Sequence, residues 1–324
     1  MIIDTHIHII VNEITQKITK DPWSPNTGYE NGKPFVEFGG KRLNSALHEF
    51  VDVDKILNKQ TEAGINKTLL SPWSSLFRYD SDVSTTLSVN RIQNDALAKI
   101  ASEYSDQIIA LGMIPLQDVS SAISELKYCM DIGLKGVEIG TNINGKYLGE
   151  EEYRPFWAMV EKLGAFVQIH PVPGLGGQTN KQYYLWNAFS NPAETALTAS
   201  HIILSGLMEE HPKLKIQLFH GGGHLPYQIG RLDRAYEMRP EASKKISRKP
   251  SEYLKMFYFD TITHSSDALN YLINLVGAEQ VMMGSDYPFD MGYERPTELI
   301  DESNLSETEK IKIKYDNAER LFQI

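Results

Sequence analysis

The 324-residue sequence contains one cysteine, Cys129, and fewer basic than acidic residues. A single cysteine cannot form an internal disulfide, and its place within the apolar pattern Leu126–Met130 predicts a buried thiol and not a nucleophile. With 32 basic and 42 acidic residues, the formal net charge is −10. This balance argues against nucleic-acid binding, which requires a basic surface.

The sequence also has no apolar run of membrane-spanning length. Its N-terminus has no basic region before the apolar residues, and Asp4 interrupts them. We therefore expect no signal peptide and no membrane association. Together with the cysteine usage, this favours a cytoplasmic protein.

The first strand is not followed by a Gly-x-Gly-x-x-Gly turn, and no phosphate-binding loop is visible, which disfavours a doubly wound nucleotide-binding sheet. Instead, strand-like and helix-like patterns alternate along the chain. Eight such pairs predict a (β/α)8 barrel, formed by residues 1–324 as a single α/β domain. The expected strands are Ile2–Ile9, Ile65–Ser71, Ile108–Leu116, Leu134–Thr141, Ala165–Pro171, Lys215–Gly221, Met256–Thr263 and Gln280–Tyr287. The expected helices are Val53–Ala63, Val83–Tyr104, Val119–Ile132, Tyr153–Leu163, Ala193–Glu210, Pro226–Met238, Asp267–Val276 and the C-terminal segment.

One segment interrupts this alternation, at about residues 10–50, where several prolines and glycines follow the first strand. A connection of this length within a compact domain is usually a lid or a binding loop. We therefore expect a long functional insertion after strand one.

The first strand carries His6 and His8, one residue apart. Side chains at positions i and i+2 of a strand lie on the same face, so the two imidazoles can bind one ion. The alternative is two histidines on a half-exposed strand, and the pair alone is a weak signal.

Further polar residues follow apolar runs at the expected ends of later strands. They are His170 after strand five, His220 after strand six and Asp286 after strand eight. The active site of a barrel lies at the C-terminal ends of its strands. Each residue alone could be a hydrogen-bonded structural group, but their common position favours a metal centre.

These motifs resemble the amidohydrolase superfamily, and more narrowly its decarboxylase branch. The resemblance includes His-x-His, the histidine after strand five, His-Gly-Gly-Gly after strand six and Gly-Ser-Asp-Tyr-Pro-Phe after strand eight. Further matches are Gly136–Thr141, Asn191–Thr195, Gly230-Arg231, Met238–Pro240, Asp260 with His264, and Asn317-Ala318.

The resemblance implies a metal set of His6, His8, His170 and Asp286, with water completing the site. Family members with two metal ions usually place a bridging lysine or glutamate at the end of strand four. Here that strand ends Ile139-Gly140-Thr141, with Glu138 before this tip and no lysine on it, which favours one metal ion. Zinc is the expected ion, with manganese as the alternative.

The resemblance further implies that His220 is the catalytic acid/base, beside the metal without binding it, while Asp286 also has a catalytic role. The expected reaction is non-oxidative decarboxylation of a small unsaturated or aromatic carboxylate. The same barrel could instead be a hydrolase or hydratase of a lactone, amide or unsaturated acid. A binding scaffold without catalysis is disfavoured, because it needs no acid/base group.

Four residues are expected to contact the substrate. Arg239 matches an arginine that the family donates to the neighbouring subunit, which implies a homodimer. Arg42 is the candidate for a second substrate-binding arginine, but its spacing to the following helix departs from the family pattern. The substrate could therefore be a related carboxylate, such as a hydroxybenzoate. Trp186 and Phe289 match pocket aromatics, and core packing is the alternative for both.

Overall fold

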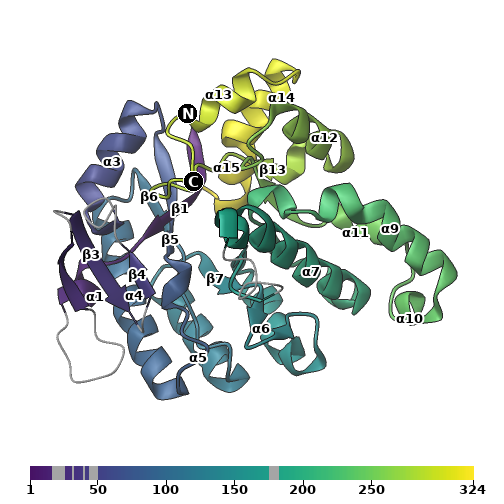
Figure 1. Ribbon diagram of the computed structural model, residues 1–324, viewed down its shortest axis with the longest axis horizontal. Coiled ribbons are helices and arrows are strands. Elements are labelled where there is room, and N and C mark those ends of the chain that lie inside the picture. The colour runs from purple at the N-terminus through teal and green to yellow at the C-terminus, as the bar shows by residue number, and fades with distance from the viewer. Residues whose placement is uncertain (17–25, 31–32, 39–40, 44–49, 175–181) are drawn as a thin grey trace. The chain divides into compact units, whose positions relative to one another are not determined.

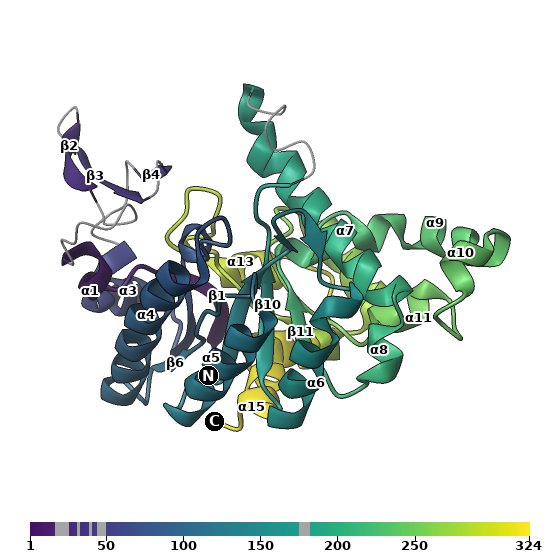
Figure 2. The ribbon, with the colours of Figure 1, turned by 90° about the horizontal axis from the view of Figure 1, so that it is seen from below.

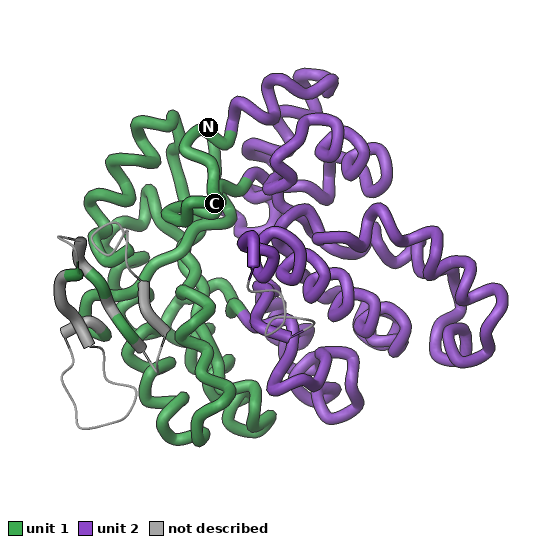
Figure 3. The backbone as a smooth tube through the Cα atoms, in the orientation of Figure 1, with its two compact units in different colours: residues 1–138, 284–296 green, residues 139–283, 297–324 purple. Residues whose placement is uncertain are grey.

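The computed structural model describes residues 1–16, 26–30, 33–38, 41–43, 50–174 and 182–324. Contacts divide the chain into two compact units (Figure 3). The first unit comprises residues 1–138 and 284–296, and the second comprises residues 139–283 and 297–324.

Eight parallel strands form the framework (Figure 1). They are β1 (Ile3–Ile9), β5 (Lys67–Pro72), β6 (Ile108–Ala110), β7 (Gly136–Gly140), β10 (Phe166–His170), β11 (Lys215–Leu218), β12 (Tyr258–Asp260) and β13 (Val281–Met282). One sheet has the order β1-β5-β6, and another has the order β13-β12-β11-β10-β7. An isolated bridge between Gly112 and Val137 joins the strands after β6, and another between Ile7 and Tyr287 joins the chain beyond β13 to β1. This cyclic strand order confirms the predicted (β/α)8 class.

Helices connect consecutive strands, as parallel pairing requires. In the first unit these are α3 (Val53–Glu62), α4 (Val83–Glu103) and α5 (Val119–Asp131). In the second unit they are α6 (Arg154–Leu163), α7 (Asn191–Leu204), α8 (Leu207–Glu210), α9 (Leu225–Met238), α10 (Pro240–Ser243), α11 (Pro250–Leu254) and α12 (Ser266–Val276) (Figure 2). After the last strand come α13 (Pro296–Asp301), which begins at the last residue of the first unit, α14 (Glu307–Ile311) and α15 (Asn317–Phe322). Among the described residues, no helix has both the length and the apolar character needed to cross a membrane.

Sequence and local conformation agree at several helix ends. Asp52, Asp82 and Asp118 each accept a hydrogen bond from a backbone N–H in the first turn of α3, α4 and α5. The predicted helix Ala193–Glu210 is wrong as a single element, because α7 ends at Leu204 and α8 begins at Leu207. Gly206 separates them with a left-handed φ of 81°, which interrupts the helix. Glycine adopts this conformation without steric cost because it has no β-carbon.

The segment after β1 contains more regular structure than its prolines and glycines predict. Helix α1 (Asn12–Gln16) is followed by the antiparallel strands β2 (Asn26–Glu30), β3 (Lys33–Phe38) and β4 (Lys41–Leu43). Pro34 lies in the central strand β3 but lacks an N–H donor. It is tolerated there because β4 pairs only with Val36–Phe38 and not with Pro34.

Candidate metal centre and acid/base site

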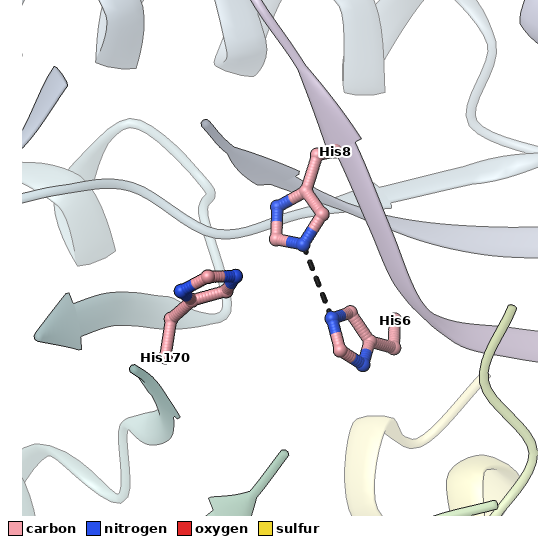
Figure 4. A group of neighbouring side chains, drawn as sticks. All are labelled: His6, His8 and His170. Carbon is pink, nitrogen blue, oxygen red and sulfur yellow. Dashed lines mark hydrogen bonds between the residues drawn. The ribbon is translucent and has the colours of Figure 1, made fainter. Parts of the chain in front are cut away.

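His6 and His8 lie on β1, whose seven residues are all buried. The two rings meet edge to face at a centroid distance of 5.0 Å, and their Nε2 atoms are 3.1 Å apart (Figure 4). The spacing of two residues therefore places both imidazoles on one face, as predicted.

Asp286 reaches the same two imidazoles from the chain that follows β13. Its Oδ1 atom lies 3.3 Å from the Nε2 atom of His6 and 3.3 Å from that of His8. Backbone bonds fix this approach, because Asp286 N–H donates to the His6 carbonyl over 2.7 Å and His8 N–H donates to Tyr287 over 2.9 Å. The φ of Asp286 is 58°, a left-handed value that is uncommon outside glycine and typical of functional sites.

The donor set of His6, His8 and Asp286 fits a divalent metal ion. Two ligand atoms that each lie about 2.1 Å from one ion are about 3.0 Å apart at a right angle and about 3.4 Å apart at the tetrahedral angle. The three observed separations are 3.1, 3.3 and 3.3 Å. Two imidazoles and one carboxylate are also ligands that zinc and manganese accept.

The surroundings of His8 suit a metal ligand. Burial lowers the pKa of His8, although hydrogen bonding to Asp286 acts in the opposite direction. The neutral imidazole, which is the form that binds metals, is thereby favoured. Its Nδ1 atom lies 3.2 Å from the carbonyl of Pro72, a contact that leaves Nε2 for the ion.

Glu138 lies on the other side of His8. Its Oε2 atom is 3.8 Å from Nδ1, on the ring edge opposite the Nε2 atom that faces Asp286. Complete burial raises the pKa of Glu138 well above its usual range, although the positive charge that His6 can carry lowers it. Glu138 thus lies behind His8, on the ring edge away from Asp286.

Asp4 joins the two segments that carry these ligands, a role that the sequence analysis missed. The completely buried carboxylate accepts hydrogen bonds from His6 N–H over 3.1 Å and from Ser285 N–H over 3.1 Å. It also accepts the Ser285 hydroxyl over 2.5 Å. Burial raises the pKa of Asp4 to about 6, and the Ser285 hydroxyl is the largest opposing cause.

Phe289 lies directly on this group of residues. Its ring meets His8 edge to face at 5.3 Å and Phe50 at 5.0 Å. Phe289 is only half-buried. Complete burial in the core is thus not its position, and its substrate contact stays a prediction.

In the second unit, His170 is the last residue of β10 and is buried. Its Nδ1 atom lies 2.7 Å from the carbonyl of Pro171, an arrangement that again leaves Nε2 for another partner. Thr141 N–H donates to the His170 carbonyl over 3.0 Å and ties β10 to the residue that follows β7.

His220 lies near His170, with 5.9 Å between the ring centroids. The predicted strand Lys215–Gly221 is too long, because β11 ends at Leu218 and His220 begins a 3-10 turn. The turn forms because the φ of His220 is 56° and that of Gly221 is 60°, values that cannot continue a strand. Asp260 accepts hydrogen bonds from both of these residues, another contact that sequence reasoning did not identify.

The remaining predicted residues lie in varied surroundings. Arg239 directly follows α9 and pairs with Glu241, and its side chain is 67% exposed. Trp186 is 43% exposed, so core packing is the wrong interpretation for this residue. Arg42 lies on β4 opposite Glu37, and its side chain falls outside the part that the structure describes. Cys129 is completely buried, as predicted.

Comparison with known proteins gives a consistent assignment. The family model described as "Amidohydrolase" matches residues 3–324. A 2-amino-3-carboxymuconate-6-semialdehyde decarboxylase of Dictyostelium discoideum is 32% identical over 98% of this chain and 90% of its own length. A gamma-resorcylate decarboxylase of a Rhizobium strain is 29% identical over 86% of this chain and 89% of its own length.

A solved structure agrees with these sequence relatives. The 5-carboxyvanillate decarboxylase of Sphingomonas paucimobilis is 25% identical, with a TM-score of 0.85 over 100% of this chain and 99% of its own. The family match, the relatives and the fold confirm the predicted resemblance. The chain belongs to the amidohydrolase family, in the branch whose named members are decarboxylases.

Proposed function

We propose that this chain removes CO2 from a small unsaturated or aromatic carboxylate, using one zinc ion held by His6, His8, His170 and Asp286. The observation that carries the proposal is the convergence of His6, His8 and Asp286 at ligand-like separations. His170 is added because it ends a parallel barrel strand, and such strand ends share one catalytic rim. Manganese is the alternative ion for a site that includes a carboxylate.

The named relatives support the substrate class. Their names describe decarboxylation of a carboxymuconate semialdehyde, of gamma-resorcylate and of 5-carboxyvanillate. All three substrates carry a carboxylate on an unsaturated or aromatic carbon. We infer a substrate of that kind here and leave its further substituents to experiment.

When bound, the ion supplies positive charge that attracts the substrate carboxylate and stabilises the electron pair left by CO2. The bond between the ring or vinyl carbon and the carboxylate breaks, and the electron pair stays on that carbon. His220 then delivers a proton to the same carbon and recovers one from solvent, so that one proton is consumed for each CO2 released. Asp286 would bind the ion and help to orient the water that completes the site, and the ring of Phe289 lies against His8.

Arginine side chains complete the proposed recognition of the substrate. The exposed guanidinium of Arg239 is free to leave Glu241 for a carboxylate of a molecule bound in a neighbouring subunit, since exposed ion pairs are weak. We therefore propose a homodimer in which Arg239 serves the partner's site. Arg42 and Trp186 remain proposed substrate contacts, and the single buried cysteine supports a cytoplasmic location.

The direct test is to load the purified protein with metal and assay carboxymuconate semialdehydes, hydroxybenzoates and lactones. Release of CO2 supports the proposal, whereas addition of water without carbon loss would indicate the hydrolase or hydratase alternative. Elemental analysis should find one divalent ion per chain, and the His6→Ala/His8→Ala double variant should lose it. Two tightly held ions per chain would contradict the proposed ligand set.

The acid/base role is tested with His220→Ala, which should retain the metal and lose about hundredfold or more in kcat. His224→Ala is the matched control, because His224 is a half-buried imidazole four residues away that contacts Phe189 at 5.0 Å. A His220→Ala variant that loses its metal would make this residue a ligand. Normal turnover in the same variant would remove it from the mechanism.

A further inference from the structure

The turn that carries His220 contains four consecutive residues with left-handed backbone. The φ values are 56° at His220, 60° at Gly221, 78° at Gly222 and 61° at Gly223. Glycine adopts these values without steric cost, but a residue with a β-carbon does not. His220 is therefore held in a conformation that its neighbours must stabilise.

Close packing fixes the glycine part of this turn. A β-carbon at Gly221 would lie 2.8 Å from Cγ2 of Thr263, and one at Gly222 would lie 2.7 Å from the ring of Phe259. A β-carbon at Gly223 would collide with the carbonyl oxygen of Pro192. The three glycines thus let the turn pack directly against β12, the loop after it and the start of α7.

Asp260 stabilises the histidine part of the turn. Its carboxylate accepts hydrogen bonds from His220 N–H over 2.9 Å and from Gly221 N–H over 2.7 Å. A third bond, from Ile262 N–H over 3.0 Å, holds the carboxylate at the end of β12. The Asp260 side chain is completely buried, so these contacts form away from solvent.

The consecutive N–H groups of His220 and Gly221 thus bind one carboxylate, as the N–H groups of anion-binding turns do, and we call this arrangement the nest. Here the anion is a side chain of the same protein, fixed by the neighbouring strand. Hydrogen bonds from N–H groups to a carboxylate are stronger than those to a neutral acceptor. Together, the nest and the packed glycines determine the direction in which the His220 side chain leaves the backbone.

We propose that Asp260 is a positioning residue for catalysis, acting through the backbone of His220 and not through contact with substrate. The inference rests on the proposed acid/base role of His220. A proton donor must lie within hydrogen-bond distance of the carbon it serves, and a displacement of about 1 Å can cost about hundredfold in rate. Loss of the nest should therefore lower turnover while leaving the metal and substrate contacts in place.

The test is Asp260→Asn, which preserves the size of the side chain. The amide has no charge, and its NH2 group cannot accept a bond from a backbone N–H. We expect kcat to fall by about tenfold to hundredfold, with KM within about twofold of the parent and the metal content unchanged. Asp267→Asn is the matched control, since Asp267 is an exposed acid in the first turn of α12.

A double-mutant cycle separates positioning from a general effect on the fold. If Asp260 acts through His220, adding Asp260→Asn to His220→Ala should reduce kcat no further than about twofold. Losses that multiply in the double variant would overturn the proposal. Parental kcat in folded Asp260→Asn would overturn it as well.

Amide hydrogen exchange gives a readout that does not depend on activity. Exchange at His220 and Gly221 should accelerate in Asp260→Asn, whereas exchange in the strands should stay at the parental rate. If the Asn variant does not fold, Gly221→Ala distorts the same turn without altering Asp260 and should reproduce the kinetic effect. If His220→Ala is fully active, the proposed acid/base role of His220 fails, while the exchange rates still decide whether Asp260 holds the turn.

Discussion

Replacing Ser285 with alanine should loosen the metal centre without touching a ligand. The Ser285 hydroxyl donates to the buried Asp4 carboxylate, and Asp286 is the next residue. A hydrogen bond to a buried charge contributes about 1.5–3 kcal/mol. The variant also loses the weaker bond that Tyr287 N–H donates to the hydroxyl over 3.2 Å. The bonds from Ser285 N–H to Asp4 and from Asp286 N–H to His6 remain, so the segment should keep its path.

The expected result is a folded protein with weaker metal binding. Loss of a residue that supports a ligand typically lowers metal affinity by about tenfold to hundredfold. This factor corresponds to about 1.4–2.8 kcal/mol, which agrees with the value of the lost hydrogen bond. Competition with a chelator measures the affinity. Ser303→Ala is the control, because Ser303 is a buried serine that donates to the Ile300 carbonyl in the second unit.

The metal-free protein provides a pH test of the same contact. Folding raises the pKa of Asp4 from 3.8 to about 6. The contribution of Asp4 to the free energy of unfolding is therefore fully present below about pH 4 and is lost as pH rises through 6. Without the Ser285 hydroxyl the folded pKa rises further, and the loss on ionisation becomes larger. The difference in unfolding free energy between parent and variant should therefore grow from pH 5 to pH 8. A constant difference, together with parental metal affinity, would refute this reasoning.

Two further predictions concern other parts of the chain. Arg239→Ala should raise KM or lower kcat without unfolding the protein, and mixing it with His220→Ala should restore part of the activity, because one hybrid site has both groups intact. An active monomer in sedimentation, or no recovery after proven subunit exchange, would contradict the shared site. Asp118→Ala should destabilise the protein by about 1 kcal/mol, because the side chain accepts Ser121 N–H at the start of α5. Hydrogen bonding to Ser121 lowers the pKa of Asp118, so this loss should be present at neutral pH and vanish as pH falls through the folded pKa, as denaturant titrations at several pH values can show.

The shared face of His6 and His8 on β1 could be predicted because it depends on local geometry alone. His6 and His8 share a face through strand periodicity, and this is what the structure has. Asp286 needed one more assumption, that the last strand of a barrel lies next to the first. The bridge between Ile7 and Tyr287 satisfies it, which is why a residue 280 positions away in sequence could be assigned to the same site.

The supporting acids could not be predicted, because their function depends on contacts between distant segments. Asp4 bonds Ser285, and Asp260 bonds His220. In the sequence, each is one carboxylate beside apolar residues, a pattern that equally suits a strand end or a capping residue. What the sequence does not show is their burial: each carboxylate is completely buried, and a buried acid needs hydrogen-bond donors around it.

The buried carboxylates of Asp286, Asp4 and Asp260 differ in role because they face different groups. Asp286 faces two imidazole nitrogens, a contact that an ion can replace with two coordinate bonds. Asp4 and Asp260 instead face backbone N–H groups of His6 and His220, which no metal would displace. Their bonds act on the direction of a neighbouring side chain and not on its charge. The proposed ligand and the proposed acid/base are thus each held by an aspartate through the main chain, and precise placement of both imidazoles depends on carboxylates that need not touch the substrate.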